Sequence, residues 1–526
     1  MRKNDSILFV VPPHCEPSMP LLAAAQLSAY AAKINLPFYF IDLNISLRNS
    51  LLKKNGKKFF NNCDKINSFS KYWNTVKEVN GCWNNIKKSA NYKITWDGVD
   101  RSEKWYKKET LSQFVSSNRD ISECEKIYLS HLWEKIDVVN PNVVAISISF
   151  DSQFLESITI GRILKKKYPT LKVIFGGGLI RSYAKNQNHV SKLFSGIVDI
   201  IFSGEGEYLL SALKEYGIKR ILQKRKYNSD SANFPLFLSA KKLRLDLKVN
   251  YSQLIDYNIF DQFDYSSPNT IFPYRINSAC YWGNCSFCAD HQYNNINQNR
   301  NSLSEKFAFL SDLKKEKNIF GIMFQDSAIS PRVLSDISDY FLKYNVQYFW
   351  GTNVRFEKAF IDRNLMEKMY HAGCRFLRFG LESGSQRIID DMNKGFQIET
   401  AREVMNNCRS IGILTHIYLI CGYPGENIED LKKTEDFILN EETHPDTFNI
   451  SQFIAYKESI KGEKHFKKIE KSFWDVPFVP SISDHLDHYI NQLYKKHSFR
   501  YQPSRVLISP AHTLAFYSDS SRWSVT

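Results

Sequence analysis

Short apolar runs alternate with longer helical stretches at the beginning of the chain. The runs Ile7–Val11 and Pro37–Ile41 flank an Ala-rich helical segment at Leu21–Lys33. Further along, the alternation resumes and includes a turn of three glycines, Gly176–Gly178. Continuous apolar strands separated by helices are typical of a parallel sheet covered on both faces. The pattern predicts a doubly wound parallel α/β domain over residues 1–218. Its later elements are Val143–Ile148, Phe154–Lys167, Leu171–Phe175 and Ile197–Phe202.

A second β/α series begins near residue 270. It contains six apolar strands with helical stretches between them, fewer than the eight units of a closed barrel. We therefore expect an incomplete (β/α)6 barrel over residues 266–453, with its chemistry at the carboxyl ends of the strands. The expected strands are 271–279, 319–325, 347–353, 374–381, 413–421 and 446–453. The expected helices are 303–317, 331–344, 361–372, 398–411 and 428–440.

Three segments fall outside these two patterns. Residues 45–140 are polar and rich in Lys and Asn, yet they contain five Trp residues. This indicates a folded insertion in the first domain, because disordered segments are poor in aromatic residues. Residues 219–265 begin with a basic run followed by a Ser- and Asn-rich stretch, and are expected to be a linker. Residues 454–526 are expected to form a small C-terminal region.

Composition and charge restrict the function classes. A chain of 526 residues with 43% hydrophobic residues is expected to form two or three globular domains. The net charge of +15 is dispersed, so a solvated surface is favoured over a nucleic-acid partner. No apolar run approaches the ~18–20 residues of a membrane span, and the start does not resemble a signal peptide. With seven scattered cysteines, the sequence predicts a cytoplasmic protein with reduced thiols and no membrane partner.

Three cysteines lie within nine residues, in a loop that follows the first predicted barrel strand: Cys280-Tyr-Trp-Gly-Asn-Cys285-Ser-Phe-Cys288. They could be incidental thiols, although their density argues against this. Together with His291 they could hold a structural zinc ion as a Cys3His site. They could also hold a four-iron cluster by three thiolates, which leaves one iron open for a substrate or cofactor. The spacing alone does not decide between the two metal centres, but a catalytic cluster belongs at the end of a barrel strand.

A carboxylate and a hydroxyl, Glu382 and Ser383, stand at the end of an apolar strand. A core-facing position would reject a carboxylate, so a ligand-binding role is favoured. The alternative is a structural ion pair between Glu382 and Arg378. His416, in the fifth predicted strand, is a weaker candidate for a residue that faces a substrate.

The cysteine loop and the segments downstream of it resemble the radical S-adenosylmethionine (SAM) superfamily. Phe287 occupies the aromatic position that typically precedes the last cysteine. Three further segments are similar to the second-, fourth- and fifth-strand motifs of the Elongator/methylthiotransferase-like subgroup. They are Phe324–Asp326, Phe379–Arg387 with Met392–Gly395, and Cys421–Glu426.

This resemblance implies a set of cofactors and their ligands. Cys280, Cys285 and Cys288 would hold a 4Fe–4S cluster, beside which SAM would bind. The sequence departs from the usual pattern at one point, because four residues instead of three separate the first two cysteines. The residues implied to contact SAM are Phe287, Asp326, Glu382, Ser383, Arg387 and Gly422.

The first domain resembles the cobalamin-binding-like domain that precedes many radical SAM barrels. Classical cobalamin domains carry an Asp-x-His-x-x-Gly loop, whereas the first loop here reads Val11-Pro-Pro-His14-Cys-Glu-Pro17. The resemblance therefore implies cobalamin bound without a histidine ligand to cobalt, and His14 is expected to be an ordinary loop residue. A glycine turn after a strand suits a cofactor at the carboxyl edge of a parallel sheet. The positions implied to contact cobalamin are Ser149, Gly176, Gly177, Gly178 and Glu205, and Asp199 also matches.

Together, the resemblances imply an enzyme that cleaves SAM to a 5′-deoxyadenosyl radical and, with cobalamin, C-methylates a natural-product or peptide substrate. A flavodoxin or ferredoxin would supply the electron. The enzymatic alternatives are cobalamin-independent rearrangement or dehydrogenation, and radical modification of tRNA. A zinc-stabilised binding protein is the alternative without catalysis. No catalytic side chain is assigned from the sequence.

Replacing Cys280, Cys285 and Cys288 together with Ala tests the metal centre. If these thiolates hold a 4Fe–4S cluster, the triple variant loses the brown colour and forms no 5′-deoxyadenosine from SAM. Iron, sulfide and zinc are measured after anaerobic reconstitution. One tightly bound zinc ion and no iron in the unsubstituted protein would favour the zinc-stabilised binding protein instead.

Overall fold

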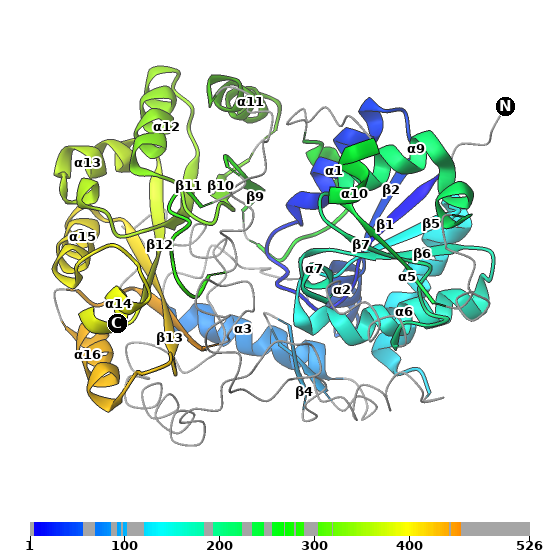
Figure 1. Ribbon diagram of the computed structural model, residues 1–526, viewed down its shortest axis with the longest axis horizontal. Helices are drawn as coiled ribbons and strands as arrows, with labels where there is room; N and C mark the ends of the chain where they lie inside the picture. Colours follow the sequence, from blue (N-terminus) through cyan, green and yellow to red (C-terminus); the bar gives the residue numbers. More distant parts are fainter. Residues whose placement is uncertain are drawn as a thin grey trace. The chain divides into compact units, whose positions relative to one another are not determined.

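The computed structural model divides into two compact α/β units, shown in Figure 1. The first comprises residues 1–62 and 72–266, and the second comprises residues 63–71 and 267–526. Each contains a six-stranded sheet whose strands are all parallel, which confirms the predicted fold class. The residues that the structure describes are 5–55, 69–85, 92–95, 98–101, 120–183, 193–223, 234–246, 255–267, 269–277, 280–288, 303–317, 319–440 and 443–453.

The first sheet has the strand order β2-β1-β5-β6-β7-β8. Because β1 lies between β2 and β5, the strand order reverses there, and ligands of doubly wound sheets bind outside the carboxyl ends of the strands at such a point. The apolar strands are buried, and in β1 all five residues are buried. The strands are β1 (Ile7–Val11), β2 (Phe38–Asp42), β5 (Val143–Ser147), β6 (Lys172–Gly176), β7 (Ile200–Ser203) and β8 (Leu236–Ser239).

Helices cover both faces of this sheet (Figure 1). On one face lie α1 (Leu22–Lys33), α9 (Gly206–Gln223) and α10 (Ala240–Asp246), which share an apolar core with the strands. On the other face lie α2 (Leu43–Lys54), α5 (Glu123–Val139) and α6 (Phe154–Lys167). The remaining elements of this part of the chain are α3 (Phe69–Asn84), β3 (Tyr92–Ile94), β4 (Val99–Arg101), η2 (Asp151–Gln153), α7 (Gly178–Tyr183) and η4 (Tyr257–Phe260).

Two stretches differ from the sequence interpretation. The expected insertion at 45–140 includes most of α2 and all of α5, whose apolar sides pack in the domain core. Helix α5 begins with a capping box, in which Ser122 and Glu125 satisfy each other's backbone amides. The expected linker at 219–265 contributes β8, which extends the sheet beside β7. The predicted C-terminal region, residues 454–526, lies outside the described residues.

The second sheet runs β14-β13-β12-β11-β10-β9, in strict sequence order. This is the predicted partial barrel, with each strand beside the next and a helix between. Its strands are β9 (Ile271–Tyr274), β10 (Gly321–Phe324), β11 (Phe349–Val354), β12 (Cys374–Glu382), β13 (Leu414–Cys421) and β14 (Thr447–Gln452).

The helices of the second unit lie along the outer side of this sheet (Figure 1). They are amphipathic, and local signals set their ends. In α12, Ser330 caps the first turn and Pro331 follows it, as is typical of a helix start. Among the helices that the structure describes, none is long and apolar enough to cross a membrane. The helices are α11 (Leu303–Glu316), α12 (Pro331–Lys343), η6 (Lys358–Ile361), α13 (Arg363–His371), α14 (Gln386–Asp391), α15 (Ile398–Ile411) and α16 (Ile428–Leu439).

Candidate functional site

The three clustered cysteines lie in the loop after β9, and each is partly exposed. The loop is fixed by Ser286, whose backbone amide donates to Met392 O at 2.9 Å. The Ser286 hydroxyl donates to Asp391 O at 3.0 Å and lies 3.1 Å from the hydroxyl of Tyr423. The cysteine loop is therefore tied to the turn after α14 and to the segment after β13, which are far apart in the sequence.

An aromatic and cationic contact holds the other half of the loop. The Trp282 indole donates to Asn393 O at 3.1 Å, and the guanidinium of Arg355 lies over its ring at 4.2 Å. Arg355 is buried and also donates to the backbone oxygen of Lys394. Gly395 has a φ of 73°, and an added Cβ would overlap the Trp282 ring. Only glycine fits there, since the turn must pass close under the indole.

Glu382, at the end of β12, forms a buried ion pair with Lys394. The Lys394 Nζ to Glu382 Oε1 distance is 3.0 Å, and the two side chains are 5% and 11% exposed. Glu382 has a φ of 68°, which costs a residue with a Cβ about 1–3 kcal/mol and occurs mainly where function demands it. The alternative pairing with Arg378 is wrong, because Arg378 donates to the Tyr418 hydroxyl at 3.3 Å.

Two cations stand beside the cysteine loop. Arg355 Nη1 lies 3.7 Å from Cys285 Sγ. Burial raises the pKa of the Cys285 thiol, whereas the positive charges of Lys394 and Arg355 lower this pKa. Lys394 Nζ also lies 5.8 Å from the centre of the Phe287 ring. A bound metal replaces the thiol proton, and positive charge nearby then stabilises the thiolates.

The predicted SAM residues Ser383, Arg387 and Gly422 lie where the end of β12 meets the segment after β13. Ser383 is buried, with its hydroxyl 3.3 Å from Thr434 Oγ1. Arg387 pairs with Asp430 and donates to Gly425 O at 2.9 Å. The amide of Gly422 donates to Glu426 Oε2 at 2.6 Å, and burial raises the pKa of Glu426 to about 7. These contacts bring the predicted residues together, while SAM contact itself stays a prediction.

Asp326, predicted to bind the SAM amine, is fully buried just after β10. Its carboxylate accepts from the amides of Ile276, at 2.9 Å, and Asn277. Burial raises its pKa to about 6, although these amides and the Arg275 and Lys306 charges lower it. The carboxylate therefore holds the chain that leads into the cysteine loop, and its contact with SAM stays a prediction.

The structure adds two residues that the sequence interpretation did not assign. Lys394 lies within the Met392–Gly395 segment, where a lysine after a helix is usually solvated, yet it is 4% exposed and neutralises Glu382. Arg355 directly follows β11, but nothing in the sequence distinguished it from other basic residues. One signal was available: Arg355 comes directly after an apolar strand, as Ser383 does, and such positions lie at the carboxyl end of the barrel. The proposed zinc ligand His291 lies outside the described residues.

At the carboxyl edge of the first sheet, the predicted cobalamin positions have different surroundings. Gly177 and Gly178 are exposed, and Ser149 is partly exposed. Gly178 has open space around an added Cβ, whose nearest neighbour would be Ser149 O at 3.9 Å. At Gly177, where φ is 103°, an added Cβ would overlap the backbone of Ile148. Gly177 is therefore required for packing between two loops.

Three other polar residues of this unit are internally paired. His14 is fully buried, with Nε2 3.8 Å from Glu156 Oε1 on α6. Glu205 pairs with Arg244 at 2.7 Å. Asp199 pairs with Lys165 at 2.9 Å and precedes β7, so it lies at the edge opposite to the loops that follow the strands. Phe150, by contrast, is 51% exposed beside Ser149, and adds an apolar side chain to the carboxyl edge.

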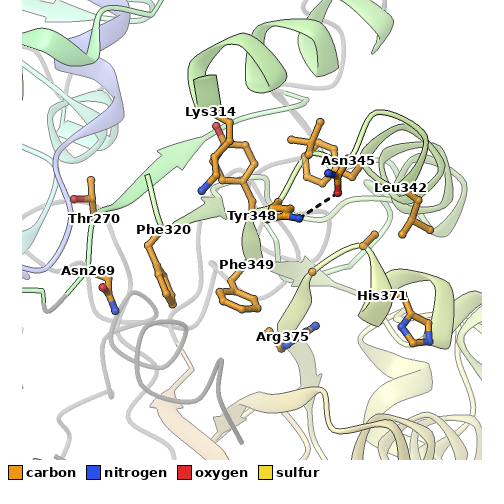
Figure 2. Close-up of a pocket in the computed structure, with 15 residues that line it drawn as sticks. Asn269, Thr270, Lys314, Phe320, Leu342, Asn345, Tyr348, Phe349, His371 and Arg375 are labelled. Carbon is orange, nitrogen blue, oxygen red and sulfur yellow. Dashed lines mark hydrogen bonds between the residues drawn. The ribbon is translucent and has the colours of Figure 1, made fainter. Parts of the chain in front are cut away.

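A separate cavity of about 720 Å³ opens at the amino ends of the second sheet (Figure 2). Thr270, Phe320, Phe349 and Arg375, which line it, stand before or at the start of β9, β10, β11 and β12. Chemistry in β/α barrels takes place at the opposite, carboxyl face. The cavity is therefore distinct from the cysteine loop and the Glu382 site.

Comparison with known proteins agrees with this geometry. Residues 275–438 match the model of the radical SAM superfamily. They form a radical SAM domain. The match contains the cysteine loop, the end of β12 and the segment after β13, so the sequence resemblance is confirmed and the chain is an enzyme that contains a radical SAM domain. Enzymes of this superfamily use SAM and a 4Fe–4S cluster.

Two curated relatives and one solved structure extend the comparison. The chain is 22% identical over 339 residues to an uncharacterized methyltransferase of Pyrococcus horikoshii, covering 62% of this chain and 71% of that protein. It is 24% identical over 362 residues to a probable threonylcarbamoyladenosine tRNA methylthiotransferase of Archaeoglobus fulgidus, covering 65% and 75%. The cobalamin-dependent SAM radical enzyme OxsB, with aqua-cobalamin bound, has a similar fold: the TM-score is 0.59 at 13% identity, covering 94% of this chain and 67% of OxsB.

The side chains present fit the cofactors of the superfamily. Three partly exposed thiols on one clamped loop, with two cations nearby, match a cluster held by three thiolates. Within the described ranges, no group of three or more His, Cys, Asp or Glu is close enough to hold a metal ion. In a four-iron cube, each thiolate binds a separate corner. Three thiols on one loop are therefore a suitable donor set for the cluster.

Replacing Lys394 with Met tests whether the ion pair supports the turn below the cysteine loop. Glu382 would stay buried without a counter-charge, and we expect a loss of about 3 kcal/mol in the free energy of unfolding of the barrel. Adding Glu382→Gln should recover more than half of that loss. Denaturant unfolding of the anaerobic protein, followed by tryptophan fluorescence, measures both effects.

The control is Lys432→Met, since Lys432 pairs with Glu429 on the exposed side of α16 at a similar distance, 2.9 Å. This variant should leave stability unchanged, because exposed pairs contribute little. If Lys394→Met behaves like Lys432→Met, the buried pair does not support the turn.

Proposed function

We propose that the chain is a cobalamin-dependent radical SAM methyltransferase that acts on a small molecule. The observation that carries the proposal is the carboxyl edge of the first sheet. There, exposed Gly177 and Gly178 lie beside partly exposed Ser149 and exposed Phe150, next to the point where the strand order reverses. A surface of glycine backbone and one aromatic ring suits a large, flat, mainly apolar macrocycle.

The absence of a histidine ligand to cobalt is part of this proposal. The His14 imidazole is fully buried and faces Glu156 on α6. Reaching a ligand outside the sheet would require the first loop to unpack, and burial of a large side chain makes that costly. The similarity in fold to a cobalamin-bound radical enzyme and the curated methyltransferase relative support the same function.

In the second unit, the side chains of this chain hold and orient the cofactors. Cys280, Cys285 and Cys288 would hold the cluster, and the Glu382–Lys394 pair would place a carboxylate oxygen toward SAM. When bound, the cluster and SAM supply one-electron cleavage of a carbon–sulfur bond, and cobalamin supplies a transferable methyl group. A flavodoxin or ferredoxin is the proposed source of the electron.

The cobalamin proposal is tested by Gly178→Leu. Gly178 has ordinary backbone angles and free space at Cβ, so a leucine fits the fold while filling the proposed corrin surface. We expect the reconstituted variant to retain less than one tenth of the cobalt of the unsubstituted enzyme. Iron content and 5′-deoxyadenosine formation should not change. Cobalt and iron are measured on the same samples.

Gly81→Leu is the matched control, because Gly81 also has open space at Cβ but lies on α3, which is not among the predicted cobalamin positions. It should take up cobalamin normally. Gly177→Val is unsuitable as a test, since its clash with Ile148 would unfold the loop whether or not cobalamin binds. If the unsubstituted enzyme retains no cobalamin but still cleaves SAM, the chemistry is cobalamin-independent.

Radical modification of tRNA is the second candidate. It is favoured by the likeness to a probable tRNA methylthiotransferase and by the net charge of +15. Binding of tRNA that weakens steeply with salt, together with a modified nucleoside in the product, would support it over small-molecule methylation.

A further inference from the structure

Four polar residues lie side by side across the second sheet. Arg378 is in the middle of its strand, His416 and Thr447 are near the start of theirs, and Asn353 is near the end of β11. The strand register pairs Asn353 on β11 with Arg378 on β12, and Arg378 with His416 on β13. It also pairs His416 with Thr447 on β14. Residues paired in register in a parallel sheet project to the same face. We call these four residues the polar row.

The polar row lies on the same face of the sheet as the candidate site. Gly380 follows Arg378 by two residues and shares its face, and the neighbours of an added Cβ there are Glu382 and Lys394. The intervening Phe379 has the opposite orientation, because it stacks on Phe356 at 4.4 Å between ring centroids. The polar row therefore faces the interior of the partial barrel.

The two central members are buried, yet they retain unused hydrogen-bonding atoms. Arg378 is 7% exposed and His416 is 2% exposed. Arg378 Nη1 donates to the Tyr418 hydroxyl, whereas Nε and Nη2 have no partner in the described part of the chain. His416 Nδ1 lies 2.8 Å from Thr447 Oγ1, and Nε2 is likewise without a partner there.

Asn353 adds an acceptor of fixed orientation. Its Nδ2 donates to Asp326 O at 2.7 Å, which identifies the other atom as the carbonyl oxygen. That oxygen, Oδ1, is buried and has no partner among the residues described. Buried polar atoms in proteins are almost always hydrogen-bonded, and a buried charge is normally paired. Unused atoms on three adjacent strands therefore indicate a binding site for a group outside the fold.

We propose that the polar row binds the carboxylate of the substrate, and that this substrate carries a hydroxyl or amino group next to the carboxylate. The proposal rests on the proposed function of the barrel and specifies its substrate class. Nε and Nη2 form one edge of the guanidinium, and two parallel N–H donors match the two oxygens of a carboxylate. Asn353 Oδ1 then accepts the neighbouring O–H or N–H.

The charge of the row favours a carboxylate over a phosphate. Burial and the Arg378 charge lower the pKa of His416 to about 3, so the imidazole is neutral and Arg378 is the only cation in the row. A phosphate would bring further anionic oxygens toward the carbonyl oxygen of Asn353. A single carboxylate with an adjacent donor satisfies both residues.

Depth separates Arg378 and His416 from the Glu382 end of the site, whereas Asn353 donates to Asp326 O and lies beside that predicted SAM residue. Arg378 precedes Glu382 by four residues along β12, which is roughly 10–13 Å of strand. Between them, Gly380 and Tyr418 are partly exposed, whereas Arg378 and His416 are buried. SAM at the strand ends and a substrate carboxylate at the polar row would therefore occupy different levels of one barrel.

The test uses the reconstituted holoenzyme, saturated with SAM, and glycolate as the probe, because glycolate joins a carboxylate to a hydroxyl. Glycolate should raise the melting temperature and bind more tightly than acetate. In Arg378→Met, glycolate affinity should fall about 10- to 150-fold, the range for charge-assisted hydrogen bonds. The same variant should raise the melting temperature of the probe-free enzyme, because an apolar side chain replaces a buried unpaired charge.

Arg375→Met is the matched control on the same strand. Arg375 donates to Tyr370 O and Cys374 O and packs on the Tyr370 ring at 3.9 Å, so its loss should lower stability and leave glycolate affinity unchanged. Arg378→Lys keeps the charge without the two-donor edge and should also weaken glycolate binding. Arg378→Lys replaces Arg378→Met in the binding test if Arg378→Met does not fold.

Three results would overturn the proposal. One is glycolate affinity that is equal in the unsubstituted enzyme and in the folded Arg378 variants. The second is inorganic phosphate binding more tightly than glycolate. The third is loss of SAM binding in Arg378→Met, which would assign the row to SAM. Failure of the proposed function differs from all three, because it appears in the unsubstituted enzyme, which would then retain no cobalamin or form no 5′-deoxyadenosine.

Discussion

The radical SAM domain depends on one constraint: a short loop that carries three thiols must be held at the open end of a parallel sheet. The loop has no regular secondary structure of its own, so its position comes from contacts to the Asp391–Gly395 turn. Ser286 and Trp282 bond to the backbone of that turn, and Arg355 bonds to it from the end of β11. The Lys394–Glu382 pair then locks the turn to the end of β12. Disturbing any of these would move the cysteines relative to the strands.

The same contacts also set the electrostatics of the site. Two cations act on Cys285: Arg355, which follows β11, and Lys394, which lies in the turn. Glu382 neutralises Lys394. A cluster with three thiolate ligands is anionic, and a partly buried anion needs compensating charge. The residues that clamp the loop are thus also those that supply this charge, which couples the mechanical and electrostatic roles of Arg355 and Lys394.

The polar row retains unused hydrogen-bonding atoms, whereas two carboxylates predicted to contact cofactors do not. The buried carboxylate Asp326 has both oxygens occupied by backbone amides, and Glu205 has a salt-bridge partner. Arg378, His416 and Asn353 instead retain buried atoms without partners in the described part of the chain. Such atoms lower stability, and folds retain them where a ligand completes the hydrogen bonds. This contrast sets the polar row apart from Asp326 and Glu205, whose carboxylates already have partners within the fold.

The sequence by itself determined the two parallel sheets and the motifs. Apolar runs and capping residues act locally, so the barrel elements were predictable to within a few residues, such as α12 at Pro331–Lys343. The spacing of the three cysteines and the carboxylate at the end of β12 were also visible locally. Only the tertiary structure decided which partners these residues have. Lys394 pairs with Glu382, Gly177 packs on Ile148, and Arg378 aligns with His416 and Asn353. Partner choice depends on how separate strands and turns converge in space, and no local pattern encodes that convergence.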